Sequence, residues 1–410
     1  MIASSATRKT AASIAAYASR AKTLGDRYLV CSAPVPERNR GDQALLHVVV
    51  EKLSDLSSNP LTVLTTSSQP ITSLTDQSRC RTIDRYYPIF LTQESLREQL
   101  TFPFFARQHR EMLVIGADVL DEGYSIERSI ATMNTLQLAV KSGIKTRIFG
   151  FSVNGVPSKG LTDRISRLAH HTRLMVRDPV SFRRLKNAGI DNVEQVGDLA
   201  FLLDPASKDT IDSATFSFCS KHAKKLVGLN LTSVVMGHYK QASSKINMLA
   251  AACRKLARTE GWRFLLIPHD EPEGIEFLQT FQELLEEPSI DEPTSHLVSD
   301  LPHCTTLKCL AGLCKHLFTC RLHLGIAALG MGTPVTGFPY QGKFEGQFEL
   351  FQLAEDGLIS PDELPDASNE MVRLMAKRFD QNMALRNKIL DRLPDILRLS
   401  EKNFDGIGAS

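Results

Sequence analysis

Short apolar runs alternate with amphipathic stretches along most of the chain. Arg27–Ala33, Glu111–Gly116 and Lys145–Phe151 are apolar runs of the length expected for buried strands. Between the second and third runs, apolar residues recur at helical spacing over residues 126–143, which predicts a helix. Because strands and helices alternate in this way, we predict one doubly wound α/β domain over residues 27–204.

A second alternation begins at Leu226, where the run LVGLNLT predicts another buried strand. Residues 205–222 before it are rich in Ser, Asp and Thr, which is typical of a linker. We therefore predict a second Rossmann-like domain over residues 223–368 and a helical tail over residues 369–410. Two Rossmann-like doubly wound domains that face each other across a cleft form the glycosyltransferase-B architecture, here with an acceptor side on the first domain and a donor side on the second.

The stretch 316–348 carries the most specific candidate chemistry. An apolar strand pattern ends there at Arg321-Leu322-His323, and a helix pattern of small residues follows. In open α/β sheets, ligands bind where strands end and helices begin, and helix N-terminal amides favour anions. Arg321 and His323 thus indicate an anionic ligand and proton transfer. The alternative is that Arg321 is a solvated surface group and His323 a structural histidine.

A similar turn follows the first strand. Asn39-Arg40-Gly41-Asp42 precedes a predicted helix over Gln43–Leu56. Strand, loop and helix in this order have the shape of an anion-binding first turn. Asp42 is equally well explained as a helix cap, so the sequence leaves these two interpretations open.

Composition excludes several classes of protein. The chain has 48 basic and 46 acidic residues and a net charge of +2, so no basic excess indicates nucleic-acid binding. No apolar run approaches the roughly 20 residues of a membrane-spanning helix. Eight cysteines in 410 residues do not form a disulfide scaffold, and those between Cys304 and Cys320 lack the paired spacing of a zinc site. We expect buried thiols, no metal and a reducing cytoplasm.

Residues 1–26 are rich in Ala and Ser and contain four basic residues. This composition resembles a transit peptide but lacks the apolar core of a secretion signal. We expect an N-terminal helical extension of a cytoplasmic protein, with a basic face that is either solvated or in peripheral contact with the inner face of the membrane.

Several motifs together resemble the polysaccharide pyruvyl transferase family. The resemblance covers most of residues 28–350, and Arg321-Leu322-His323 is its most specific motif. The other matching motifs are Asn39-Arg40-Gly41-Asp42-Gln43-Ala44, Val176-Arg177-Asp178 with Ser181, Asp198-Leu199-Ala200-Phe201, Pro268-His269-Asp270, Gly332-Thr333-Pro334-Val335, and Tyr340, Lys343 and Gly346. The chain departs from the family at Gly116-Ala117-Asp118, where members often carry three glycines.

The resemblance implies an enzyme of polysaccharide or exopolysaccharide biosynthesis. Its donor would be phosphoenolpyruvate, and its acceptor a free, nucleotide-linked or lipid-linked sugar. The pyruvyl group would form a ketal on the sugar with release of phosphate, without a cofactor or a metal.

The residue types at the matching positions fit this reaction. Arginine grips carboxylate and phosphate groups with two hydrogen bonds, so Arg177 and Arg321 would hold the donor, together with Leu322 of the same motif and with Lys343. His323 would be the general acid. The residues expected to face the acceptor are Asn39, Asp42, Asp118 and His269.

Two other functions remain open from the sequence. Gly332-Thr333-Pro334-Val335 also resembles the donor loop of nucleotide-sugar glycosyltransferases, in which Glu345 or Glu349 would meet the ribose. A non-catalytic glycan-binding protein is the second alternative, and the intact Arg177, Arg321 and His323 argue against it.

Overall fold

The computed structural model describes most of the chain from residue 27 onward. The described residues are 27–31, 38–56, 61–64, 80–83, 96–122, 126–153, 155, 157–232, 242–286, 292–339, 343–353, 357–359, 364–365 and 367–408. The predicted extension at residues 1–26 and the motif residue Tyr340 lie outside them. The chain divides into two compact units, which are described separately: unit 1 contains residues 1–36, 45–199 and 399–410, and unit 2 contains residues 37–44 and 200–398.

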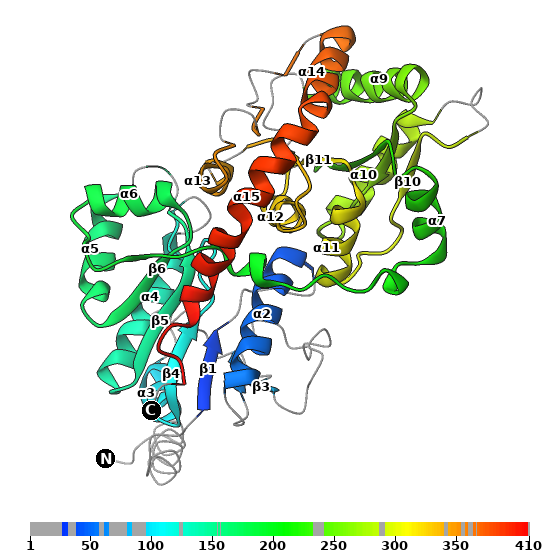
Figure 1. Cartoon of the computed structure of the whole chain (residues 1–410). Helices are drawn as coiled ribbons and strands as arrows, with labels where there is room; N and C mark the ends of the chain where they lie inside the picture. Colours follow the sequence, from blue (N-terminus) through cyan, green and yellow to red (C-terminus); the bar gives the residue numbers. More distant parts are fainter. Residues whose placement is uncertain are drawn as a thin grey trace, which may run out of the picture. The chain divides into compact units, whose positions relative to one another are not determined.

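Unit 1 is built on a sheet of seven parallel strands (Figure 1). The strand order is β3-β2-β1-β4-β5-β6-β7, so the direction of winding reverses between β1 and β4. The strands are β1 (Arg27–Cys31), β2 (Leu61–Leu64), β3 (Cys80–Ile83), β4 (His109–Val114), β5 (Lys145–Phe151), β6 (Thr172–Val176) and β7 (Glu194–Gln195). The central strands are almost wholly buried because helices cover both faces of a doubly wound sheet.

The helices of unit 1 follow the predicted alternation. They are α2 (Arg40–Leu56, whose first five residues belong to unit 2), α3 (Leu96–Ala106), α4 (Ile126–Lys141), α5 (Lys159–Ala169) and α6 (Pro179–Asn187). Helix α6 begins as its sequence predicts: Pro179 is its first residue, and the Asp178 carboxylate accepts a hydrogen bond from the Ser181 amide at 2.7 Å.

The last residues of the chain complete unit 1. A short 3-10 helix, η4 (Lys402–Phe404), places Asn403 beside β5. The Asn403 side chain accepts a hydrogen bond from the Gly150 amide and donates one to the Gly197 carbonyl, both at 2.9 Å. Arg147 also donates to the carbonyl oxygens of Asn403 and Asp405. These buried bonds explain why the C-terminal residues fold with the first unit.

Unit 2 contains a second parallel sheet, with the order β10-β9-β8-β11-β12. Its winding also reverses, between β8 and β11. The strands are β8 (Leu226–Asn230), β9 (Arg263–Leu266), β10 (Ser295–Leu297), β11 (His316–Thr319) and β12 (Val335–Gly337). The helices are η1 (Leu199–Leu202, from its second residue), η2 (Lys208–Thr210), α7 (Ser213–Lys221), α9 (Ala242–Glu260), α10 (Glu273–Leu285), α11 (Cys304–Leu313), α12 (Leu322–Gly330), α13 (Phe344–Leu350), α14 (Ser368–Asp380) and α15 (Asn382–Glu401, to residue 398).

The domain boundaries differ from the sequence prediction at two places. Residues 205–222, predicted as a linker, contain η2 and α7 and belong to unit 2, where Thr215 on α7 hydrogen-bonds His296 on β10 at 2.8 Å. Residues 37–44 belong to unit 2, because the Arg40 amide donates to the His269 carbonyl and the Glu271 amide donates to the Arg38 carbonyl, both at 3.1 Å. Backbone pairing between residues that are far apart in sequence leaves no signal in the hydrophobic pattern.

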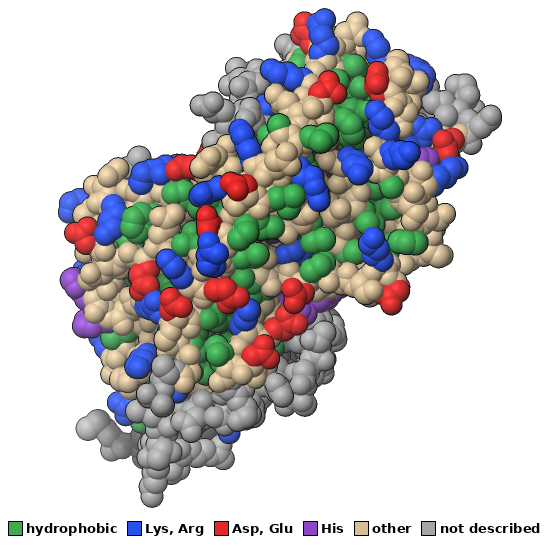
Figure 2. Space-filling view, viewed as in Figure 1, with side chains coloured by type: hydrophobic (Ala, Val, Ile, Leu, Met, Phe, Trp, Pro, Cys, Tyr) green, Lys and Arg blue, Asp and Glu red, His purple; other side chains and the backbone are tan. Residues whose placement is uncertain are grey.

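Charged side chains of both signs are interspersed on the visible surface of the described residues (Figure 2), in keeping with the small net charge. Within the part of the chain that the structure describes, no helix combines the length and the apolar character needed to cross a membrane.

Candidate active site

The site is built at the carboxyl edge of the unit 2 sheet, where β11 passes into α12. The Thr319 hydroxyl accepts a hydrogen bond from the Arg321 amide at 2.9 Å and lies 3.0 Å from Asn230 Oδ1, to which it donates. Asn230 Nδ2 donates to the Ile267 carbonyl at 2.9 Å. This chain of bonds ties together the ends of β8, β9 and β11, and it holds Arg321 as the N-cap residue of α12.

Arg321 forms an ion pair with Asp270, which follows β9. Both side chains are largely buried. Burial raises the pKa of Asp270 above its ordinary value, although the positive charge of Arg321 acts in the opposite direction. The second carboxylate oxygen of Asp270 has no hydrogen-bond partner among the described residues. Asp270 therefore holds the Arg321 guanidinium in place without satisfying its own hydrogen-bonding capacity.

His269 lies next to this ion pair and is 4% exposed. Its pKa is lowered well below the ordinary value, first by burial and then by the positive charges of Arg321, His323 and Arg40. Burial and the neighbouring positive charges thus disfavour protonation of His269. Its Nδ1 has no hydrogen-bond partner within the described part of the chain. An electropositive, buried environment of this kind suits an anionic ligand.

The first turn of α2 supplies the other side of the site. Asn39 is its N-cap: the side-chain oxygen accepts hydrogen bonds from the amides of Gly41 at 2.8 Å and Asp42 at 3.3 Å. Capping is thus performed by Asn39 and not by Asp42, and α2 begins three residues earlier than predicted. Arg40 donates from Nε to the Pro302 carbonyl and from Nη2 to the Leu301 carbonyl, both at 2.6 Å.

Gly41 and His323 make the closest approach in this group. A Cβ atom added to Gly41 would lie 2.4 Å from His323 Nδ1, a distance that no side chain tolerates. His323 is the second residue of α12 and is partly buried. The glycine therefore lets the backbone of α2 pack directly against the imidazole.

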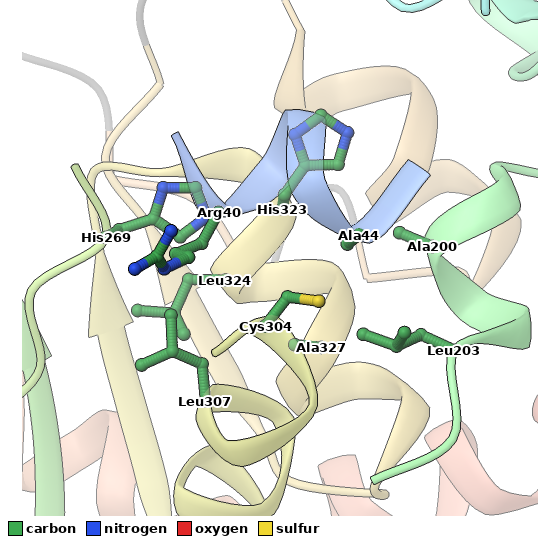
Figure 3. Close-up of a pocket in the computed structure, with 10 residues that line it drawn as sticks. All are labelled: Arg40, Ala44, Ala200, Leu203, His269, Cys304, Leu307, His323, Leu324 and Ala327. Carbon is green, nitrogen blue, oxygen red and sulfur yellow. The ribbon is translucent and has the colours of Figure 1, made fainter. Parts of the chain in front are cut away.

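A small cavity of about 10 Å³ opens between these elements (Figure 3). Arg40 and His269 lie together on one side of it, Ala44, Ala200 and Leu203 lie on the other, and Cys304 lies between them. Leu307, His323, Leu324 and Ala327 complete the lining. A space of this size holds about one water molecule.

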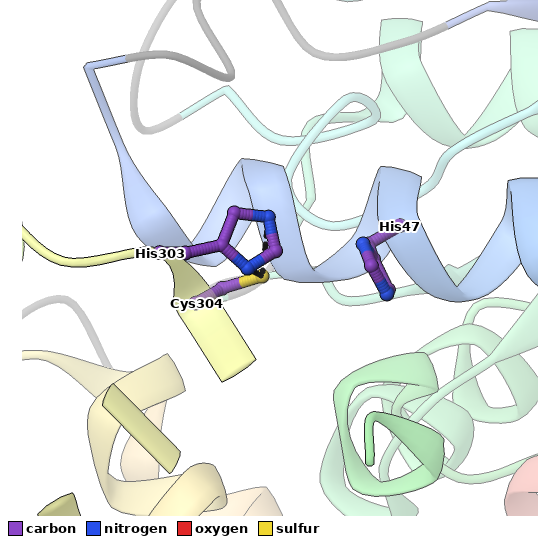
Figure 4. Close-up of side chains that lie close together, drawn as sticks. All are labelled: His47, His303 and Cys304. Atoms are coloured by element: carbon purple, nitrogen blue, oxygen red, sulfur yellow. Dashed lines mark hydrogen bonds between the residues drawn. The ribbon is translucent and has the colours of Figure 1, made fainter. Parts of the chain in front are cut away.

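Cys304 begins α11 within the same unit. Its amide donates to the Gln43 side-chain oxygen at 2.8 Å, and its sulfur lies 3.8 Å from His303 Nδ1 (Figure 4). The third residue drawn there, His47, lies on α2 within unit 1.

A sequence model of the family described as polysaccharide pyruvyl transferase matches residues 39–342. The chain belongs to the polysaccharide pyruvyl transferase family. It is therefore a transferase that acts on polysaccharide. Among curated proteins, none matches the sequence.

Solved structures resemble this chain over most of its length. A putative UDP-N-acetylglucosamine 2-epimerase from Listeria monocytogenes has 13% identity and a TM-score of 0.55, covering 93% of this chain and 97% of its own. The UDP-GlcNAc 2-epimerase from Neisseria meningitidis bound to UDP-GlcNAc has 13% identity and a TM-score of 0.57, with coverages of 92% and 97%. An alpha,alpha-trehalose-phosphate synthase (UDP-forming) from Burkholderia vietnamiensis has 14% identity and a TM-score of 0.51, with coverages of 92% and 98%.

At these identities the likeness shows the fold alone. Together with the two parallel sheets, it confirms the predicted α/β fold with two Rossmann-like domains, which is the glycosyltransferase-B type. The predicted family is confirmed as well.

Arg177, predicted to hold the donor, lies among carboxylates of unit 1. Its side chain is fully buried in unit 1 and donates to Ser152 Oγ at 2.7 Å, to Asp198 at 2.9 Å and to Asp118 at 3.1 Å. Burial alone lowers its pKa, but the charges of Asp198, Asp118 and Asp178 outweigh burial and raise it. These contacts tie Arg177 and Asp118 into unit 1. Contact of Arg177 with the donor and of Asp118 with the acceptor stays a prediction.

Two further residues predicted to bind the donor are buried in unit 2. Lys343 is the N-cap residue of α13. Leu322 is the first residue of α12 and has a buried side chain, so only its backbone amide suits an anion. Contact between either residue and the donor stays a prediction.

The structure also adds residues that sequence reasoning missed. Arg40, Asp270 and Cys304 join His269 and His323 at the site. The first two stand inside the matching motifs and could have been chosen from them. Cys304 carries no sequence signal beyond its place at the start of a helix.

Proposed function

We propose that this protein transfers a pyruvyl group from phosphoenolpyruvate to a sugar of a polysaccharide or of its precursor, forming a ketal and releasing phosphate. Family membership supports the transferase class. The observation that carries the finer proposal is the placement of Arg40, His269 and His323 around one cavity in unit 2, next to the Arg321–Asp270 ion pair.

Arg321 would bind the donor. Phosphoenolpyruvate carries a carboxylate and a phosphate, and the planar guanidinium matches either group with two parallel hydrogen bonds. In the structure this guanidinium pairs with Asp270, whose ionised form is disfavoured by burial. The donor anion would therefore compete with Asp270 for Arg321, and Asp270 would keep the arginine in position between turnovers.

His323 would deliver the proton. It transfers a proton to the methylene carbon of the donor, which leaves an oxocarbenium centre at carbon 2. One sugar hydroxyl attacks carbon 2, and its proton restores His323. A second hydroxyl displaces phosphate from the same carbon, and its proton leaves with the phosphate. The methylene becomes a methyl group, two carbon–oxygen bonds to the sugar form, and the carbon–oxygen bond to phosphate breaks.

The acceptor remains defined only as a sugar with two hydroxyls near each other. Asn39 uses its side-chain oxygen as a helix cap, so its part in acceptor binding would have to come from its amide nitrogen. Asp42 and His269 stay candidates for acceptor contacts. We further propose a cytoplasmic enzyme, without a metal or another cofactor.

The test is phosphate release from phosphoenolpyruvate by purified protein with a panel of free, nucleotide-linked and lipid-linked sugars, with and without chelator. Formation of a ketal and equal rates in chelator support the proposal. Release of UDP from a nucleotide sugar, with no reaction of phosphoenolpyruvate, would instead establish the glycosyltransferase alternative.

A further inference from the structure

The cavity beside His323 is polar at one end and apolar over the rest of its wall. Arg40, His269 and His323 are its polar residues. The remaining wall comes from η1, α11, α12 and the first turn of α2, and it consists of Ala44, Ala200, Leu203, Cys304, Leu307, Leu324 and Ala327. All seven of these side chains are buried. The cavity therefore offers polar partners at one end only.

This division matches the chemistry of the donor. Phosphoenolpyruvate has two anionic groups and one apolar group, the methylene carbon. The anionic groups need the cationic end of the cavity. The methylene must lie next to the group that protonates it, and His323 is among the residues that line the cavity.

We propose that this apolar wall holds the methylene carbon of the donor, and the methyl group that it becomes, and that it restricts the donor to an unsubstituted methylene. The inference rests on the proposed function. Leu203, Leu307 and Leu324 set the size of the space, since they are the large apolar side chains of its wall. Leu203 directly follows η1, and Leu307 lies on α11. At about 10 Å³ the cavity has no room for an additional carbon.

Binding of donor analogues tests the inference without knowledge of the acceptor. Isothermal titration calorimetry compares phosphoenolpyruvate with its Z-3-methyl analogue and with inorganic phosphate. For the wild type we expect the methyl analogue to bind on the order of 10- to 200-fold more weakly than phosphoenolpyruvate, which is the usual effect of one carbon in a tight apolar pocket.

Variants of the wall should change this ratio. Leu203→Ala and Leu307→Ala each enlarge the cavity, so the two donors should bind within about 3-fold of each other. Ala327→Val fills the cavity and should abolish phosphoenolpyruvate binding while binding of inorganic phosphate persists. Leu256→Ala is the matched control, because Leu256 is equally buried in α9 of the same unit but does not line the cavity.

The possible results separate the inference from the function on which it rests. If the wild type binds phosphoenolpyruvate and its methyl analogue equally well, the wall does not face the methylene and the inference fails, while the proposed function stands. The inference also fails if Leu256→Ala lowers the preference for phosphoenolpyruvate over its methyl analogue as much as the two wall variants do. If the wild type binds no phosphoenolpyruvate, the proposed function fails and the inference fails with it.

Discussion

Gly41 leaves His323 the space that any side chain at that position would occupy, since an added Cβ would lie 2.4 Å from Nδ1. Gly41 is the second residue of α2 and His323 the second residue of α12, so the two helix starts meet at this contact. The glycine of the Gly-Asp motif in the first turn is therefore explained by the space that the imidazole of His323 needs.

Gly41→Ala should displace the imidazole. A displacement of about 1 Å at a reacting group costs on the order of 100-fold in rate, so turnover should fall by that order. Stability should change little, because alanine favours the helix by up to about 1 kcal/mol. Gly160→Ala is the control, as Gly160 is the second residue of α5 and its Cβ would meet only ordinary contact at 3.8 Å. Steady-state kinetics and thermal unfolding of both variants check this. Full activity of Gly41→Ala would show that the imidazole has room to move.

Arg321→Lys should weaken donor binding. Lysine keeps the positive charge but loses the two-pronged geometry that fits a carboxylate or a phosphate. We expect the KM for phosphoenolpyruvate to rise at least 10-fold with the fold intact, as measured by kinetics and circular dichroism. An unchanged KM would remove Arg321 from the donor site.

His323→Gln should act on turnover. Glutamine keeps the size and the hydrogen bonding of the side chain but cannot deliver a proton. The loss of a general acid costs on the order of 10²- to 10⁴-fold in kcat, with donor affinity nearly unchanged. Rapid-quench kinetics together with donor calorimetry separate the two effects. Nearly full turnover combined with a lower melting temperature would mean that His323 is a structural residue at the start of α12.

Arg177→Gln should destabilise unit 1. The substitution leaves the buried carboxylate of Asp198 without its cation, and breaking a buried ion pair in this way typically costs about 3–5 kcal/mol. Urea unfolding followed by circular dichroism measures the loss. A variant of unchanged stability that no longer binds phosphoenolpyruvate would restore the role first predicted for Arg177.

Lys308 should make stability increase with pH on the alkaline side. Burial lowers its pKa from 10.5 to about 8, while its ammonium donates to the Phe201 carbonyl at 3.0 Å. Between these two values the unfolded chain holds a proton that the folded chain has released, so folding becomes more favourable as the pH rises. The gain is roughly 3 kcal/mol at most. Urea unfolding between pH 8 and 10 should show this increase in the wild type and a smaller one in Lys308→Met. An equal increase of the unfolding free energy with pH in the wild type and in Lys308→Met would show that Lys308 is not the group responsible.

Local patterns determined a large part of this fold. The bounds of β5 agree with the predicted strand. Helix α6 begins at Pro179, as predicted, and Asp178 is its N-cap residue. Arg321 and His323 lie at a strand end and a helix start as predicted. Hydrophobic period, capping residues and proline act over a few neighbouring residues, so they can be seen in the sequence.

Tertiary structure decided which polar groups meet. Arg177 and Arg321 both follow strands in matching motifs, yet the first is fully buried among carboxylates and the second is held by one carboxylate beside a cavity. The pairing of residues 38–40 with 269–271 moved the first turn of α2 into unit 2 and brought Arg40 to His269. That pairing joins residues more than 200 positions apart. No local pattern encodes that partnership, so the sequence placed each arginine at a strand end while only the folded chain determined which side chains surround it.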